Sequence, residues 1–484
     1  MKRTRLISTV SLFLLLLVNM ANAGITLPAI ISSNMVLQRD AKVVLWGWAD
    51  AQEEITIKVS WMINPLVVTA DNQGNWHVEL NTNLSKEPQS INFLSDESNI
   101  TLENVLFGEV WLCSGQSNMQ QPVKGYQGQP TFGSIMATAT SANHNLRLFT
   151  VDRIGSKTPL KDVDSYTPWQ EASPDNVADF SAIAYYFGQK LQEVLDVPVG
   201  MIHTSWGGSS VQAWISKEVM SNFQEVNLDD VDISKGTNHI PAALYNAMIH
   251  PLIPFTIKGA LWYQGESNRM EPEKYRELFP AMVKDWRSRW GIGDFAFYYA
   301  QIAPYWYNNN EVYSTAENSA FIREIQLQCA DLIPNSGIAV TMDIGDEFCI
   351  HPPMKIEVAD RLLFNALNQT YGLKSIDGKS PVYKSMEVKD GGIVLSFKNA
   401  ETGLFSFREL TGFEISGPDK VFYPATAKIS GEKVIVKSDK VSDPKAVRYA
   451  WQNYIEGTLF DTNLLPASSF RTDNWSDAKR YNGQ

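Results

Sequence analysis

The feature that most constrains the fold is an alternation of apolar runs with amphipathic stretches between residues 106 and 371. Runs such as 110–113 and 197–204 contain few polar residues, as expected of strands buried on both faces of a parallel sheet. In the stretch 182–195, large apolar residues recur at four-residue spacing, which is typical of one buried helix face. Strands that alternate with helices predict a three-layer α/β domain. The predicted strands are 110–113, 197–204, 258–263, 295–302 and 337–342, and the predicted helices are 182–195, 272–290, 316–330 and 356–367.

Both ends of the chain have a different pattern. Residues 24–105 and 372–484 consist of short, partly alternating runs separated by glycine, asparagine, aspartate and proline turns. Each stretch predicts a β domain, the first of them a small sandwich. The expected organisation is therefore an α/β domain at 106–371 flanked by an N-terminal β domain at 24–105 and a C-terminal β domain at 372–484.

The first 23 residues predict a signal peptide. Basic residues at positions 2, 3 and 5 precede an apolar run at 7–18, and Ala21-Asn22-Ala23 forms a small-x-small cleavage site. The run is short for a bilayer span, and no later segment is long and apolar enough to cross one. The sequence predicts an exported chain, periplasmic or secreted, without a membrane span after cleavage.

The net charge of the chain and the spacing of its cysteines and histidines argue against a nucleic acid partner, a disulfide framework and a metal site. The formal net charge of -12 disfavours a nucleic acid partner, because an acidic surface repels phosphate backbones. The odd number of cysteines, three, cannot form a full disulfide framework. The six histidines are scattered and no metal-ligand spacing is present. We expect no metal and no cofactor.

The segment after the predicted strand 110–113 is the most informative one for chemistry. The strand continues into Ser114-Gly115-Gln116-Ser117-Asn118, where glycine permits a tight turn. A helix that follows would direct its backbone N–H groups toward Ser117. Composition alone leaves Ser114 as a rival nucleophile.

Two further strands end in turns of small polar residues. One turn contains Gly207 and Gly208, and the other contains Gln264, Glu266 and Asn268. The carboxyl ends of parallel strands meet at one edge of the sheet, so donors from these turns could converge on one oxyanion.

A fourth turn, after the predicted strand 337–342, carries His351. A histidine with a pKa near neutrality can accept a proton from a serine and return it to a leaving alcohol.

Together these blocks resemble the SGNH/GDSL hydrolase superfamily and, within it, the sialate O-acetylesterases and related carbohydrate acetylesterases. The resemblance covers nearly the whole mature chain. It rests on Asn34-Met-Val-Leu-Gln-Arg39, Val44-Leu-Trp-Gly-Trp48, Gly115-Gln-Ser-Asn-Met119, Trp206-Gly-Gly208, Trp262-Tyr-Gln-Gly-Glu-Ser-Asn268 and Ile350-His-Pro352.

The resemblance implies a role for each block. Ser117 is the expected nucleophile, His351 the expected base, and Ser114 a structural turn residue. The N–H groups of Ser117 and of Gly208 or Gly207 are the expected oxyanion donors. The remaining expected oxyanion and substrate-binding residues are Gln264 or Asn268, as a third donor, together with Gln116 and Glu266.

The carboxylate that orients the histidine departs from the family pattern. The superfamily commonly has Asp three residues before His, and here that position is Phe348; narrower relatives often have Asp two before, and here that is Cys349. Asp346 is the favoured local candidate. Asp343, Glu347 and a serine–histidine dyad that uses a backbone carbonyl remain open.

The expected reaction is hydrolysis of O-acetyl esters on sialic acid through an acetyl-enzyme, with an acetylated carbohydrate as the substrate, and the sequence leaves the oligomeric state open. The main alternative keeps the chemistry on another glycan, such as acetylated xylan or xyloglucan. Two other classes stay open, a non-catalytic sugar-binding protein and a glycosidase with Asp343 and Glu266 as paired carboxylates.

Overall fold

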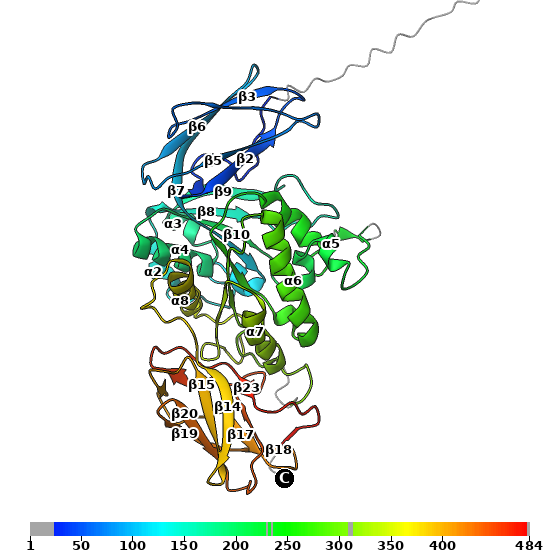
Figure 1. The fold of residues 1–484 in the computed structure, drawn as a ribbon, viewed down its shortest axis with the longest axis vertical. Coiled ribbons are helices and arrows are strands. Elements are labelled where there is room, and N and C mark those ends of the chain that lie inside the picture. The colour runs from blue at the N-terminus through cyan, green and yellow to red at the C-terminus, as the bar shows by residue number, and fades with distance from the viewer. Residues whose placement is uncertain (1–23, 229–230, 234–235, 308–312, 482–484) are drawn as a thin grey trace, which may run out of the picture.

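The computed structural model describes residues 24–228, 231–233, 236–307 and 313–481. The chain forms an elongated molecule with β regions at both ends and an α/β region between them (Figure 1).

A sheet of mostly parallel strands forms the middle of the molecule. The strand order is β13-β12-β11-β7-β10-β8-β9, and all neighbours are parallel except β8 and β9. The strands are β7 (Asn99–Gly115), β8 (Asn143–Val151), β9 (Tyr166–Ala172), β10 (Val199–Ser205), β11 (Gly259–Tyr263), β12 (Ala296–Ala300) and β13 (Ser336–Ala339). The predicted α/β class is confirmed.

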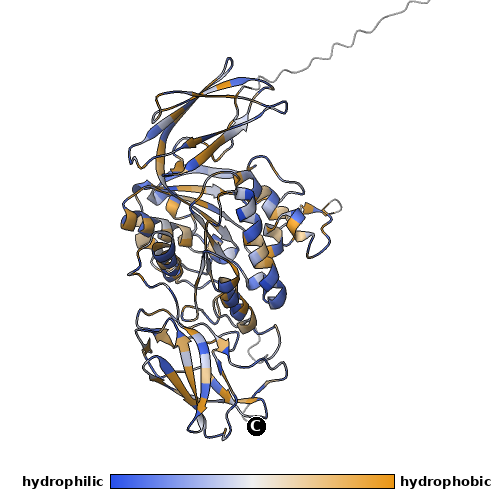
Figure 2. Cartoon of the chain, in the orientation of Figure 1, coloured by the Kyte–Doolittle hydropathy of each residue, from blue (hydrophilic) through white to orange (hydrophobic). Residues whose placement is uncertain are grey.

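Helices cover both faces of this sheet. Along β7, Trp111 and Cys113 belong to the core beneath α4 and α8, whereas Val110 and Leu112 belong to the core beneath α6 and α7. Hydrophilic residues line the outer faces of α6 and α7 (Figure 2). The helices are α1 (Ser117–Gln120), α2 (Ser134–Ala139), α3 (Pro174–Val177), α4 (Ala182–Leu195), α5 (Lys217–Met220), α6 (Pro272–Trp290), α7 (Ala320–Leu332) and α8 (Lys355–Asn365).

Strand β7 belongs to both the N-terminal and the central region. Its first residues pair with β6, Leu106–Gly108 pair with β1, and Glu109–Gly115 pair with β10 and β11. The chain therefore does not break at 105, where composition changes. The remaining N-terminal strands are β1 (Val36–Gln38), β2 (Lys42–Trp48), β3 (Glu54–Val59), β4 (Leu66–Thr69), β5 (Asn75–Asn81) and β6 (Gln89–Leu94).

The C-terminal region packs two larger sheets around their own core. Their orders are β14-β15-β20-β19 and β23-β21-β17-β18-β24, and β16 pairs with β22. The strands are β14 (Val382–Lys389), β15 (Gly392–Lys398), β16 (Leu404–Phe405), β17 (Phe413–Ser416), β18 (Val421–Pro424), β19 (Thr426–Ser430), β20 (Lys433–Lys437), β21 (Ala446–Tyr449), β22 (Phe460–Asp461), β23 (Phe470–Arg471) and β24 (Lys479–Arg480).

No helix within the described ranges combines the length and the apolar character needed to cross a bilayer. The predicted signal peptide, residues 1–23, lies outside the described residues.

Candidate active site

Three of the predicted functional turns begin at the same level of the sheet. Gly115, the last residue of β7, lies opposite Ser205 at the end of β10 and opposite Tyr263 at the end of β11. Because these neighbouring parallel strands end together, the turns that follow them emerge side by side at one sheet edge.

The turn after β7 exposes one serine and buries the other. Gly115 has a φ of +136°, and an added Cβ would lie 2.2 Å from the Tyr263 carbonyl oxygen, so this position requires glycine. Ser117 follows as the first residue of α1 and is half-buried. Ser114 is fully buried inside β7, and none of the described residues hydrogen-bonds its Oγ. Of these two serines, Ser117 is the one that a substrate could reach.

The glycine turn after β10 lies against Ser117. An added Cβ on Gly207 would lie 3.3 Å from Ser117 Cβ, so the close approach depends on glycine. The Gly207 N–H is already engaged, since it donates to Gln120 Oε1 at 2.7 Å. Gly208 has a φ of +70°, and no described residue accepts a hydrogen bond from its N–H. Of the two predicted donors, Gly208 is the one left available.

The two amides proposed as a third oxyanion donor already have structural partners. Gln264 Nε2 donates both of its hydrogens, to Ser209 O at 3.0 Å and to Asn268 Oδ1 at 2.7 Å. Asn268 Nδ2 donates to Gln212 Oε1 at 2.9 Å. Gln264 therefore has no hydrogen left for an oxyanion, whereas Asn268 Nδ2 keeps its second hydrogen, and both side chains hold the turn after β10.

Gln116 joins the first turn to the third. Its Oε1 accepts from the backbone N–H of Gly265 at 3.2 Å and of Ser267 at 3.4 Å. The role seen for Gln116 is thus to hold two turns together directly beside Ser117.

His351 lies close to the serine turn, although no hydrogen bond joins the imidazole to Ser117 Oγ among the described residues. The ring of Tyr126 packs against His351 edge to face, with 5.3 Å between centroids, and its hydroxyl donates to Ser117 O at 3.1 Å. Nδ1 of His351 contacts Gln129 Oε1. An amide oxygen at Nδ1 leaves Nε2 as the nitrogen that can act as a base.

The favoured orienting carboxylate, Asp346, is not at the imidazole. Its Oδ1 accepts from the backbone N–H of Phe348 and of Cys349, both at 2.8 Å. Asp346 therefore shapes the loop before His351, since a short carboxylate satisfies N–H groups two and three residues further on. Gln129 takes the position at Nδ1 that was expected for Asp346.

The other candidates are also placed away from Nδ1. Asp343 forms a two-pronged ion pair with Arg361, at 2.8 and 2.6 Å. For Glu347 no hydrogen bond to the described residues is seen. Cys349 donates through its thiol to His351 O at 3.1 Å and so holds the backbone of the histidine.

A buried polar chain lies beneath the serine turn. Lys355 Nζ donates to Asn118 Oδ1 at 2.6 Å, and Asn118 Nδ2 donates to Glu266 Oε1 at 2.6 Å. Asn118 Nδ2 also donates to Ile350 O at 3.1 Å. Glu266 is thus a buried partner of Asn118 rather than an exposed substrate ligand.

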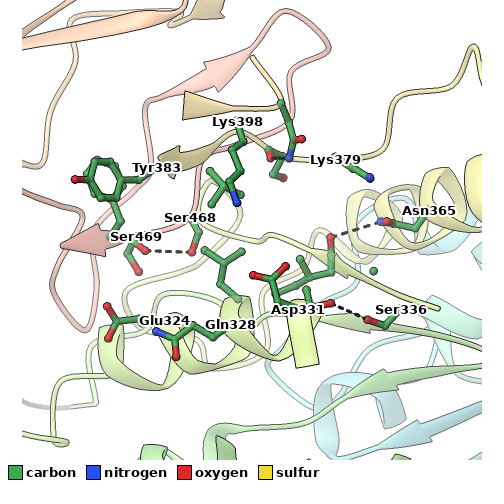
Figure 3. A pocket seen from close by; sticks show the side chains of 18 of the residues that line it. Glu324, Gln328, Asp331, Ser336, Asn365, Lys379, Tyr383, Lys398, Ser468 and Ser469 are labelled. Carbon is green, nitrogen blue, oxygen red and sulfur yellow. Dashed lines mark hydrogen bonds between the residues drawn. The ribbon is translucent and has the colours of Figure 1, made fainter. Parts of the chain in front are cut away.

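A separate cavity of about 460 Å³ lies between α7 and the C-terminal strands (Figure 3). Its charged lining includes Glu324, Asp331, Lys379 and Lys398, and none of the predicted site residues contributes to it. Within the described ranges, no group of three or more His, Cys, Asp or Glu side chains could hold a metal ion. The absence of a cofactor remains a prediction.

A family model described as "Carbohydrate esterase, sialic acid-specific acetylesterase" matches residues 107–351, from within β7 to His351. The chain belongs to this esterase family. It is a carboxylic ester hydrolase that acts on acetylated carbohydrates.

Relatives of this esterase match over most of its length. A crystal structure of a novel carbohydrate acetylesterase from Xanthomonas citri has a TM-score of 0.85 and 34% identity, covering 93% of this chain and 100% of that one. The sialate O-acetylesterase of Mus musculus is 28% identical over 93% of this chain and 94% of its own length. That of Homo sapiens is 29% identical over 76% and 75%.

Sequence reasoning missed four residues of the candidate site: Asn118, Tyr126, Gln129 and Lys355. Asn118 lies within the serine motif and Lys355 lies three residues after Pro352, so proximity to Ser117 and His351 was an available signal. Gln129 is 222 residues from His351 and lies in a Gly/Gln/Pro loop, which gives no local signal.

Proposed function

We propose that Ser117 is the nucleophile of this esterase and His351 its general base. Ser117 attacks the acetyl carbonyl, His351 accepts the hydroxyl proton and returns it to the sugar oxygen, and water then releases acetate from the acetyl-enzyme. The N–H groups of Ser117 and Gly208 stabilise the oxyanion.

The observation that carries this proposal is the common level at which β7, β10 and β11 end. It supports the convergence of Ser117 and Gly208, while Tyr126 links Ser117 to His351. The available N–H of Gly208 suits acyl transfer. A glycosidase would instead need two carboxylates in one cleft, but Asp343 is paired with Arg361 and Glu266 is buried.

The decisive test compares Ser117→Ala with Ser114→Ala on a small acetyl ester. We expect Ser117→Ala to lower kcat by roughly 10³-fold or more without unfolding the protein. Ser114→Ala should keep most of the activity. A fluorophosphonate should label wild-type Ser117, and an adduct on another residue would contradict the assignment.

For the substrate, we propose O-acetylated sialic acid, and a cation near the site supports an acidic sugar. Arg153 is exposed, and no described carboxylate pairs with it. Burial raises the pKa of Tyr126 while the Arg153 charge opposes that rise, so the guanidinium acts on the phenol that contacts Ser117. A sialic acid carboxylate would find a partner in Arg153.

A neutral acetylated glycan, such as xylan or xyloglucan, is the second candidate, and an exposed aromatic pair favours it. Trp306 is 38% exposed and Phe348 79% exposed, with 6.1 Å between their rings, on segments that follow β12 and β13 at the edge that carries Ser117. Aromatic faces of this kind suit the apolar face of a sugar ring.

Acetate release from acetylated sialosides and xylo-oligosaccharides separates the two candidates. For a sialate substrate, Arg153→Gln should raise KM on sialosides and leave a neutral acetyl ester unaffected. For a neutral glycan, Trp306→Ala should raise KM on oligosaccharides, whereas Arg153→Gln should have no effect.

The domain organisation and the export of the chain are part of the same proposal. We propose an SGNH-type catalytic domain at 106–371 between two β domains, and export of the chain after removal of residues 1–23. N-terminal sequencing of the exported protein should begin at Gly24.

A further inference from the structure

A fully buried lysine lies beneath the serine turn without a carboxylate in contact. Lys355 is the first residue of α8 and has no exposed surface. No carboxylate of the described residues lies within salt-bridge distance of its Nζ, whose hydrogen-bond acceptor is the Asn118 side chain. Removing an ammonium from water is costly in free energy, so a lysine retained here needs a reason other than packing.

The amide of Asn118 lies between a cation and an anion. Its oxygen faces Lys355, and its nitrogen faces Glu266 Oε1, both at 2.6 Å. Reversing the amide would place its N–H₂ group against the ammonium and its oxygen against the carboxylate. The two charges therefore fix the orientation of Asn118.

The fixed amide connects the two halves of the proposed catalytic pair. Asn118 follows Ser117 in the chain, and its Nδ2 donates to the carbonyl of Ile350, which precedes His351. The route from Lys355 through Asn118 to Ile350 therefore links the serine turn to the histidine loop across 232 residues of sequence.

We propose that Lys355 is a positioning residue, which orients Asn118 so that it holds the His351 loop against Ser117. This inference rests on the proposed roles of Ser117 and His351.

The electrostatic surroundings agree with this geometry. Burial and, to a smaller extent, the charge of Lys355 together lower the pKa of His351 to about 4. Burial also lowers the pKa of Lys355 to about 7, against the opposing influence of Glu266 and Cys349. The titratable groups that act on this lysine are therefore Glu266, Cys349 and His351.

The test measures kcat and the acid limb of kcat/KM for Lys355→Met and Lys355→Gln, with a small acetyl ester. Methionine removes both charge and donor, so we expect kcat to fall about tenfold and the acid limb to move to higher pH. Glutamine keeps a donor for Asn118 without the charge. It should move the acid limb in the same direction with a smaller loss of kcat, and it replaces the methionine variant if that does not fold.

Two controls make the result specific. Lys190→Met removes a lysine that pairs with Asp360 on α8 but does not contact the site. The acid limb of kcat/KM for this variant should therefore stay at the wild-type pH. Ser117→Ala in the same assay reports on the proposed function itself. An unchanged acid limb in folded Lys355 variants, with Ser117→Ala inactive, overturns the role of Lys355 alone, because a purely structural lysine would lower the rate without moving the pH profile.

Discussion

At the scale of single residues, the environment of His351 predicts an esterase active at unusually low pH. Burial and the charge of Lys355 lower its pKa to about 4, compared with about 6.5 for an unperturbed histidine. The base acts in its neutral form, so activity is lost only as pH falls through that lowered value. We expect kcat/KM for a small acetyl ester to be constant from pH 7 down to about 5 and to decline below that. A decline centred near 6.5 would contradict the environment seen for His351.

The contact between Gln129 and Nδ1 gives a second prediction at this scale. Gln129→Glu places a carboxylate where a serine–histidine–aspartate triad has one, which stabilises the imidazolium. The acid limb should therefore move to higher pH, while kcat is kept or raised. Gln127→Glu adds the same charge two residues away on an exposed part of the loop and should leave the limb nearly unchanged. Equal shifts in both variants would indicate a general charge effect and no direct contact.

At the scale of elements, variants of Asp346 in the loop before His351 distinguish a carboxylate that caps the loop from one that takes part in catalysis. Asp346→Asn keeps the oxygen that accepts from the N–H groups of Phe348 and Cys349, so most of kcat should survive. Asp346→Ala removes that acceptor and should lower kcat about tenfold, since His351 loses its support. Equally severe losses for the two variants would point to a need for the charge itself.

Regular elements were predictable where a long segment repeats one apolar pattern. Helices 182–195 and 272–290 agree with α4 and α6 at both ends, because their apolar stripes are long and uninterrupted. Strands β8 and β9 were missed. β9 pairs along one edge only and has several exposed residues, so its sequence lacks a continuous apolar run.

The residues of the candidate site also differ in how well the sequence predicts them. Ser117 and His351 lie in short motifs with a strand directly before them or nearby, whereas the contact with Gln129 depends on how a distant loop folds. Asp346 was favoured because it is an acidic residue near His351 in sequence. Proximity along the chain does not reveal that its carboxylate is used by neighbouring backbone N–H groups.

At the scale of the whole molecule, Arg323 joins the central and C-terminal regions. It is fully buried on α7 and donates to Gln452 O at 2.5 Å and to Ser469 Oγ at 3.1 Å. Arg323→Met should lower the free energy of unfolding by roughly 3 kcal/mol or more, because buried acceptors lose a charged donor. Lys420→Met, which breaks the exposed pair with Asp477, should cost about 1 kcal/mol or less. Urea unfolding measures both, and similar losses would show that Arg323 does not hold the regions together.

The continuity of β7 also limits how this chain can change in length. Side chains alternate between the two faces of a strand, so deleting one residue between Val105 and Gly115 would exchange the residues facing α4 and α8 with those facing α6 and α7. It would also draw the serine turn back by about 3.3 Å, away from the glycine turn after β10. Changes of length on the N-terminal side of the serine turn, including fusions to another N-terminal module, are therefore confined to loops before β7, and the number of residues from Val105 to Ser117 must be kept constant.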